Sequence, residues 1–300
     1  MLHDDHIHLR AHEKPPKPHN LDAVLESARE KGIIPGIREH HPMPKRYQIG
    51  KFKDYEYGMF LEEVDPYIKM FADAGIPMGI EADFIAGEEE EIKEIIDDMQ
   101  ERARKLGVPV SGVHGSVHLL PGRVKDIDWP KEGIDYICWD LDQNVFLAHI
   151  KDRGPKQILH DYFGLMLDLV GLGIYDALSH IDVIRKFDIF NSSGESIYFG
   201  EHEKLYDKLA RSVVEKVSGT RMAIEINTAG VFGMLGKPYF SQPLLNYAVE
   251  LKVPISLGSD SHYPDRIGAG FNVALKMLEI AGCEKIVTFK DRQLVEYSPF

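Results

Sequence analysis

Residues 2–8, LHDDHIH, end on two histidines that are separated by a single isoleucine. The apolar residues of this stretch are typical of a β-strand, whose period of two residues places His6 and His8 on the same face. Two readings are open. The histidines are unrelated surface or capping residues, or they are two ligands of one metal ion, since imidazole is the commonest metal ligand in proteins. The rest of the chain decides between these readings.

Short apolar runs alternate with helical patterns along the chain. The expected strands lie at residues 2–8, 33–39, 76–84, 108–118, 174–184, 222–230 and 254–260, with a weak last strand at 285–289. The expected helices lie at residues 20–32, 57–74, 88–107, 155–171, 201–217, 241–252 and 269–282. Strand–helix units repeated in this way predict a parallel sheet covered by helices, either open or closed into a barrel.

Every expected strand up to residue 260 carries an imidazole or a carboxylate at or just beyond its C-terminal end, or within its last residues. In chain order these residues are His6 and His8, Glu39 and His40, Glu81, His118, His180, Glu225 with Asn227, and Asp260 with His262. In a barrel the C-terminal ends of all strands meet at one rim, where such folds keep their catalytic groups. In an open sheet the same residues would spread along an edge. Their number therefore favours an α/β barrel, formed by residues 1–300 as one domain.

A lone histidine at a strand end is more often a surface residue than a ligand, and a salt bridge could equally hold a buried Glu81. Such a placement in every strand nevertheless favours a metal site. Imidazole and carboxylate without thiolate suit zinc, manganese or iron. The histidines and acids exceed the three protein ligands of a single catalytic zinc, so we expect two or three divalent ions with a bridging carboxylate. This arrangement is usual in phosphoester hydrolysis.

The composition limits the partners. The chain has 35 Lys plus Arg against 48 Asp plus Glu, a formal net charge of -13. It therefore lacks the basic field needed to bind long nucleic acid without sequence preference. No apolar run resembles a signal peptide or a membrane span. Cys138 and Cys283 could form one disulfide, but two cysteines resemble neither a secreted disulfide framework nor a CxxC metal site. We expect a cytoplasmic protein that neutralises a bound phosphate locally, with metal ions or a few arginines.

The ordered series of motifs resembles the polymerase-and-histidinol-phosphatase (PHP) superfamily. The motifs are DxHxH at residues 4–8, EH at 39–40, GIEAD at 79–83, GSVHLL at 115–120, SHIDVIRKF at 179–187, EINTAG at 225–230 and GSDSH at 258–262. GSVH, HIDVIRKF and EINTAG are most similar to the histidinol-phosphate phosphatase branch. The resemblance spans nearly the whole chain. It implies a distorted, TIM-like (β/α)7 barrel with a trinuclear metal site at the C-terminal rim, which hydrolyses L-histidinol phosphate to L-histidinol and phosphate.

The resemblance also assigns the metal ligands, motif by motif: His6, His8, His19, His40, Glu81, His118, His180, Asp260 and His262. The first ion is held by the two histidines of the first strand with Glu81 and Asp260. Glu81 bridges to a second ion, bound by the histidines of the fourth and fifth strands. The third ion takes the histidines of the EH and GSDSH motifs and one from the loop after the first strand. For that position we choose His19 over His12, although a proline-rich insertion makes this loop depart from the family.

The implied mechanism is in-line attack on a phosphomonoester by a hydroxide that bridges the ions. Glu81, Asp260 and His262 are the expected catalytic residues, with Asp260 or His262 relaying a proton to the leaving alkoxide. His41 and His114 lie beside stronger candidates and are expected outside the ligand set.

Four residues are candidates for binding the substrate. Arg185 and Arg266 are expected near the rim, where they would hold the phosphate or a substrate carboxylate unless they are solvated surface residues. Glu225 and Asn227 are candidates for recognising a substrate ammonium.

Three other functions stay open at this point. Another phosphoesterase of the superfamily would act on nucleotides or short nucleic acids. A metal-dependent amidohydrolase also begins with HxH, but would be expected to hold a carboxylated lysine at the end of a middle strand, where this chain has none. A non-catalytic metal-storage or regulatory barrel would keep the ligands without groups that face a substrate. The sequence does not choose the native metal.

Overall fold

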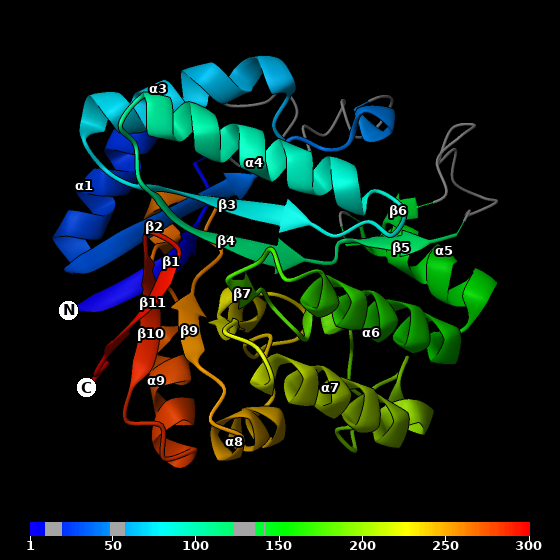
Figure 1. The fold of residues 1–300 in the computed structure, drawn as a ribbon. Helices are drawn as coiled ribbons and strands as arrows, with labels where there is room; N and C mark the ends of the chain where they lie inside the picture. Colours follow the sequence, from blue (N-terminus) through cyan, green and yellow to red (C-terminus); the bar gives the residue numbers. More distant parts are fainter. Residues whose placement is uncertain (10–19, 49–57, 123–135, 141) are drawn as a thin grey trace.

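The computed structural model describes residues 1–9, 20–48, 58–122, 136–140 and 142–300. Its main sheet has seven parallel strands in the order β1-β2-β3-β4-β7-β8-β9 (Figure 1). Their bounds are β1 Leu2–Ile7, β2 Ile33–His40, β3 Met78–Asp83, β4 Val110–Ser116, β7 Ala177–Leu178, β8 Ala223–Asn227 and β9 Ile255–Gly258. Each strand therefore lies beside strands that are near it in the chain, as repeated βα units require.

The sheet closes on itself where β1 ends and the chain leaves β9. Ile7 forms a parallel bridge with Ser261. The backbone N–H of Asp260 donates to the carbonyl of His6 at 2.8 Å, and that of His8 donates to the carbonyl of Ser261 at 2.8 Å. The expected α/β barrel of seven strands is confirmed, and its closure joins the DxHxH and GSDSH segments directly.

The described helices surround this barrel (Figure 1). They are α1 Leu21–Lys31, α3 Val64–Ala74, α4 Glu89–Lys105, α5 Gln143–Arg153, α6 Pro155–Leu172, α7 Glu203–Ser218, α8 Gln242–Glu250 and α9 Phe271–Ile280. Short 3-10 turns are η1 Lys45–Tyr47, η2 Leu61–Glu63, η3 Val183–Arg185, η4 Gly200–His202, η5 Ala229–Phe232 and η6 Pro264–Arg266. Among these described helices, none is long and apolar enough to cross a membrane.

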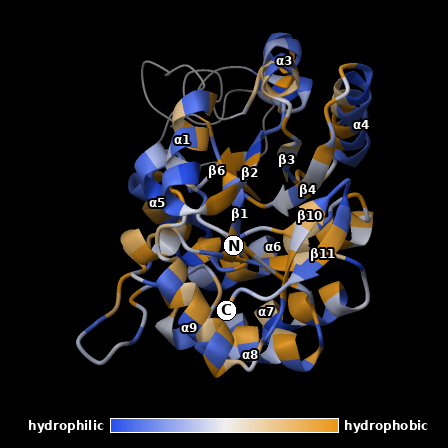
Figure 2. Cartoon of the chain, turned by 90° about the vertical axis from the view of Figure 1, so that its left-hand side faces the viewer, coloured by the Kyte–Doolittle hydropathy of each residue, from blue (hydrophilic) through white to orange (hydrophobic). Residues whose placement is uncertain are grey.

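Local sequence explains where the helices begin and end. The side chain of Asn20 accepts a hydrogen bond from the N–H of Ala23 and so caps α1, which ends at Gly32 with φ 64°. This left-handed conformation suits glycine. In α4 the first turn is acidic and the last is basic, which complements the helix dipole. The hydropathy colouring of Figure 2 shows many hydrophilic residues on α4, whereas Ile92 and Ile96 are buried against the barrel.

The fifth strand is much shorter than residues 174–184, the range expected from the sequence. Only Ala177–Leu178 form β7, and the chain turns at His180, whose φ is 24°. The N–H of His180 donates to the carboxylate of Glu225 at 3.1 Å instead of continuing a strand. The 3-10 turn η3 follows directly. An apolar run predicted a long strand here because apolarity reports burial and not backbone conformation.

Some elements have no clear pattern in the sequence and are not predicted from it. The hairpin of β5 (Leu119–Pro121) and β6 (Tyr136–Cys138) consists of three-residue strands, too short for a periodic signal. Helix α5 buries few residues and has no apolar stripe. The last expected strand is β10 (Ile286–Lys290), but it pairs antiparallel with β11 (Gln293–Tyr297) and not with the parallel sheet. The expected helix at residues 57–74 begins as η2 before α3, and Tyr57 lies outside the described residues.

Strand β10 covers the N-terminal end of the barrel. The ring of Phe289 packs edge-on against His114, with ring centroids 4.8 Å apart. The guanidinium carbon of Arg38 lies 5.0 Å from the centroid of the same ring. The hydroxyl of Thr288 donates to Asp5 at 2.7 Å. The C-terminal hairpin thus fills the end of the barrel that lies opposite the polar rim.

We expect Phe289→Ala to lower the free energy of unfolding by about 3–5 kcal/mol, because it removes a buried ring and leaves a cavity. Urea unfolding followed by circular dichroism measures this change. Phe300→Ala is the matched control, since Phe300 is 67% exposed, and its effect should stay within about 0.5 kcal/mol. Equal effects of the two substitutions would contradict the assignment of β10 to the barrel core.

Candidate metal centre

The carboxylate of Glu81 lies at the centre of a buried group of histidines on the C-terminal rim. The Nε2 atoms of His6 and His8 are each 3.3 Å from its Oε2 atom. Nδ1 of His40 is 3.2 Å from the same oxygen, and Nε2 of His180 is 3.1 Å from Oε1. Strands β1, β2 and β3 and the turn after β7 therefore bring four imidazoles to a single carboxylate.

Asp260, His262 and His118 extend this group. Oδ1 of Asp260 is 3.3 Å from Nε2 of His8, and the ring of His262 stacks on that of His8 with centroids 4.2 Å apart. Nε2 of His118 is 3.9 Å from Oε1 of Glu81. Asp260 has φ 52°, a left-handed conformation that is uncommon outside glycine. Such backbone often marks functional sites, because the surrounding structure must stabilise it.

Three further carboxylates contact the Nδ1 atoms of these rings, on the side that faces away from Glu81. Glu225 lies 2.7 Å from Nδ1 of His6, and Glu39 lies 2.8 Å from Nδ1 of His8. Asp83 lies 2.8 Å from Nδ1 of His118. An ionised carboxylate only accepts hydrogen bonds, so each Nδ1 carries a proton and each Nε2 is directed to the centre. This carboxylate–histidine arrangement is the usual support of metal-ligating histidines.

The electrostatics of the group show a need for positive charge. Burial acts to lower the pKa of His6, but the carboxylates of Glu225, Glu81 and Asp260 outweigh it and hold that pKa well above its usual value. Burial acts to raise the pKa of Glu81, but His40 and His6 hold it well below its usual value. In the absence of metal, protons on the imidazoles would balance the buried acids. Divalent ions would supply the same balance and would displace these protons, because imidazole binds metal in its neutral form.

Among the described residues, four groups have ligand atoms that all lie within 4.8 Å of one another. They are His6–His8–Glu81, His40–Glu81–His118, His8–His40–His262 and His6–His114–Glu225. The first three groups contain only expected ligands and share Glu81, His8 or His40, so the donors form one connected cluster. The donor set of imidazole and carboxylate fits zinc, manganese or iron. The grouping differs from the expectation in two respects: His40 lies with the second set of ligands as well as the third, and His8 lies with the third set as well as the first.

The remaining expected residues near the rim lie as follows. The loop ligand His19 and its alternative His12 lie outside the described residues. His41 is buried, and burial lowers its pKa to about 4. His114 is fully buried beside His6, with ring centroids 5.7 Å apart. Burial and the charge of Arg38 hold the pKa of His114 well below its usual value.

Glu225 and Asn227 do not face a substrate space. Both are completely buried. The side-chain amide of Asn227 donates to Glu225 at 3.0 Å and to Asp260 at 3.1 Å. The expected recognition of a substrate ammonium does not fit this placement, because the carboxylate of Glu225 already accepts from His6, His180 and Asn227. The two side chains instead orient His6 and Asp260.

Arg185 also lies differently from the expectation. Its guanidinium donates to Asp188 at 3.0 Å and to Glu203 at 2.6 Å, and its side chain is 8% exposed. These ion pairs turn it toward η4 and α7, so it does not fit the role of holding a phosphate. The next residue, Lys186, was not singled out from the sequence, although it belongs to the same SHIDVIRKF motif.

A small cavity of about 290 Å³ opens beside the accessible end of the metal centre. Lys186, Arg266, Asp260, His262 and Phe232 are among the residues that line it. The ammonium of Lys186 lies 3.2 Å from the carboxylate of Asp140. Two cations thus face a cavity that is bordered by two metal-ligand candidates. Arg266 lies where the sequence placed it, near the rim.

The seven-stranded α/β barrel, with histidines and carboxylates gathered at its C-terminal rim, is the arrangement that the resemblance to PHP-type metal-dependent phosphoesterases implies. Among known proteins, the chain is similar to histidinol-phosphatases. It is 26% identical over 264 residues to a probable histidinol-phosphatase of Deinococcus radiodurans, covering 85% of this chain and 84% of that one. It is 26% identical over 306 residues to a probable histidinol-phosphatase of Clostridium acetobutylicum, covering 99% and 100%. No protein-family model matches.

A solved structure of similar fold is histidinol phosphate phosphatase from Lactococcus lactis, in complex with zinc, L-histidinol and phosphate. The TM-score is 0.61 at 20% identity, and the match covers 98% of both chains. This likeness confirms the barrel fold. The sequence relatives confirm the resemblance to the histidinol-phosphate phosphatase branch that the motifs indicated.

We expect Glu39→Ala to weaken metal binding about 10–100-fold, because His8 loses the carboxylate that fixes its tautomer and ring orientation. Titration with zinc in competition with a chromophoric chelator measures the affinity. Glu30→Ala on the exposed surface of α1 is the control, and it should leave the affinity unchanged. Zinc binding that is equally tight in both variants would contradict the supporting role of Glu39.

Proposed function

We propose that this chain hydrolyses L-histidinol phosphate to L-histidinol and inorganic phosphate at a centre of two or three divalent metal ions. The observation that carries the proposal is the cluster around Glu81, in which four imidazoles lie within 3.3 Å of one carboxylate. Clustered donors that can hold neighbouring ions suit phosphoester hydrolysis. The names of the similar proteins, and the zinc, L-histidinol and phosphate in the L. lactis complex, support the choice of substrate and metal.

The described donors divide into overlapping sets around Glu81. His6, His8, Glu81 and Asp260 would hold one ion, and His40, His118 and His180 would hold a second across the same carboxylate. His262 would join His8 and His40 at a third. Bound ions neutralise the phosphate charge and lower the pKa of a coordinated water.

The accessible members of the cluster are suited to moving a proton. The side chains of Asp260 and His262 are 17% and 22% exposed, whereas those of His6, His8 and Glu81 are at most 1% exposed. Nδ1 of His262 is 3.8 Å from Oδ1 of Asp260. These two side chains border the cavity, where Asp260 or His262 would relay a proton to the leaving alkoxide.

The cavity at the rim favours a small, anionic substrate. Lys186, which also pairs with Asp140, and Arg266 place two cations at this cavity, which suits the anion of a phosphomonoester. The aromatic ring of Phe232 offers an apolar surface, with the guanidinium carbon of Arg266 5.8 Å from its centroid. A volume of about 290 Å³ lies at the lower end of the range for small-molecule sites. This size favours an amino-alcohol phosphate over a nucleic acid strand.

We expect the metal-loaded protein to release phosphate from L-histidinol phosphate faster than from nucleoside monophosphates, and to lose this activity with a chelator. Glu81→Gln should lower kcat/KM at least about 100-fold, because the site loses its central charge and several kcal/mol of transition-state stabilisation. A phosphate-release assay measures both. An active Glu81→Gln variant, or faster release from a nucleotide, would reject the proposed site or the proposed substrate respectively.

We expect Lys186→Met to lower kcat/KM for L-histidinol phosphate about 10–100-fold, since a charge-assisted contact to the phosphate is lost. The metal affinity should not change, which separates substrate binding from metal binding. Lys208→Met on the exposed face of α7 is the matched control. A kcat/KM for Lys186→Met equal to that of the control would exclude Lys186 from substrate binding.

A further inference from the structure

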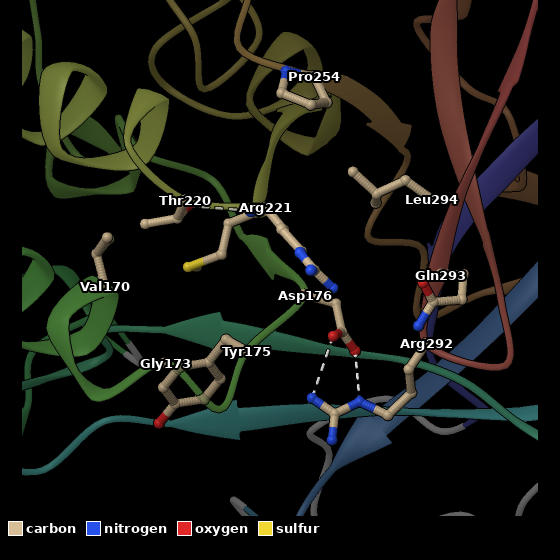
Figure 3. A pocket seen from close by; sticks show the side chains of 11 residues that line it. Val170, Gly173, Tyr175, Asp176, Thr220, Arg221, Pro254, Arg292, Gln293 and Leu294 are labelled. Carbon is tan, nitrogen blue, oxygen red and sulfur yellow. Dashed lines mark hydrogen bonds and ion pairs between the residues drawn. The ribbon is translucent and has the colours of Figure 1, made fainter.

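A second cavity lies at the end of the barrel opposite the metal centre (Figure 3). Its volume is about 760 Å³, within the range of small-molecule sites. Asp176 and Met222 line it, directly before β7 and β8. The opposite ends of these two strands lead to His180 and Glu225 of the metal centre. The cavity is therefore separate from the proposed catalytic site.

The C-terminal hairpin forms one wall of this cavity. Asp291 and Arg292, between β10 and β11, have φ 50° and 60°, the left-handed values of a two-residue hairpin turn. The N–H of Arg292 donates to the carbonyl of Ser111 at 3.0 Å. Its guanidinium donates to both carboxylate oxygens of Asp176, at 2.8 and 3.1 Å, and to the carbonyl of Ile174 at 2.5 Å. These bonds fix the wall to the barrel.

Of the charged side chains that line the cavity, Asp176 and Arg292 pair with each other, and one cation remains without a partner among the described residues. The carboxylate of Asp176 is balanced by Arg292 and also accepts from the N–H of Val113 at 2.8 Å. Arg221 has no ion pair or hydrogen bond within the part of the chain that the structure describes, and it is exposed. Figure 3 shows its side chain extending into the cavity toward the Asp176–Arg292 pair. The cavity thus holds one guanidinium that is available to a ligand.

Most of the remaining lining is apolar, with Thr220 and Gln293 as its uncharged polar residues. Val170, Tyr175 and Met222 are buried and line the cavity together with Pro254 and Leu294. A ligand that occupies this space would contact apolar atoms on several sides and a guanidinium on one. Small-molecule sites commonly combine an apolar lining with few polar groups that fix the orientation of the ligand.

We propose that this cavity binds a small monocarboxylic acid with an apolar body. The carboxylate pairs with the guanidinium of Arg221, whose planar fork matches it. The apolar body packs between Val170, Met222 and Leu294. A phosphate monoester fits less well, because a dianion would keep one charge uncompensated close to the carboxylate of Asp176. The inference does not depend on the catalytic function.

The test uses the full chain with ¹³C-labelled methionine methyl groups and 3-phenylpropionate as the probe. Met222 lines the cavity, so its methyl resonance reports occupancy of this site and distinguishes it from carboxylate binding at the metal centre. We expect a saturable shift of the Met222 resonance with the acid and a much weaker one with the neutral analogue 3-phenyl-1-propanol.

Arg221→Gln should weaken the binding of 3-phenylpropionate about tenfold or more, because a charge-assisted pair is lost. Arg104→Gln on the exposed surface of α4 is the matched control and should bind like the unmodified chain. The proposal is rejected if the Met222 resonance does not shift, if the alcohol binds as tightly as the acid, or if Arg221→Gln binds the acid with unchanged affinity.

Discussion

The contact between the buried carboxylate of Glu81 and the surrounding imidazoles is the constraint on which the rest of the structure depends. A buried charge is costly unless opposite charge or hydrogen bonds compensate it. Here the compensating rings come from β1, β2 and the turn after β7, so compensation exists only when the sheet has curved into a barrel. The backbone hydrogen bond from Asp260 to His6 closes that barrel at the same place. The fold and the site therefore depend on the same contacts.

A second layer of acids makes the arrangement specific. Glu225, Glu39 and Asp83 each accept from the Nδ1 atom of one ring, which selects the tautomer and directs Nε2 to the centre. Close packing of the neighbouring backbone also constrains the position of these carboxylates. A Cβ on Gly258 would overlap the carboxylate of Glu225 and lie 2.6 Å from Cβ of His6. The glycine of the GSDSH motif is therefore required by the approach of β9 to this pair.

The sequence predicted the barrel and the gathering of histidines and carboxylates at its rim, because both follow from local patterns of strand–helix alternation and of polar residues at strand ends. It did not predict which neighbour each residue meets. Glu225 was expected to face a substrate but supports His6, and Arg185 was expected at the phosphate but pairs with Glu203. The early end of β7 depends on the bond between His180 and Glu225, which are 45 residues apart. Such contacts exist only in three dimensions.

The net charge of -13 makes the placement of cations informative. The field of an acidic chain repels anions, but at physiological ionic strength it is screened within about 8 Å. An anion at the surface therefore responds mainly to the charges nearest to it. Lys186 and Arg266 lie beside candidate metal ligands at one end of the barrel, and Arg221 lies at the other, where the second guanidinium, that of Arg292, is paired with Asp176. Two cations beside the candidate metal ligands would suit a dianion, and the single cation at the other end that has no partner among the described residues would suit a monoanion, so the two proposed sites would select different ligands by charge.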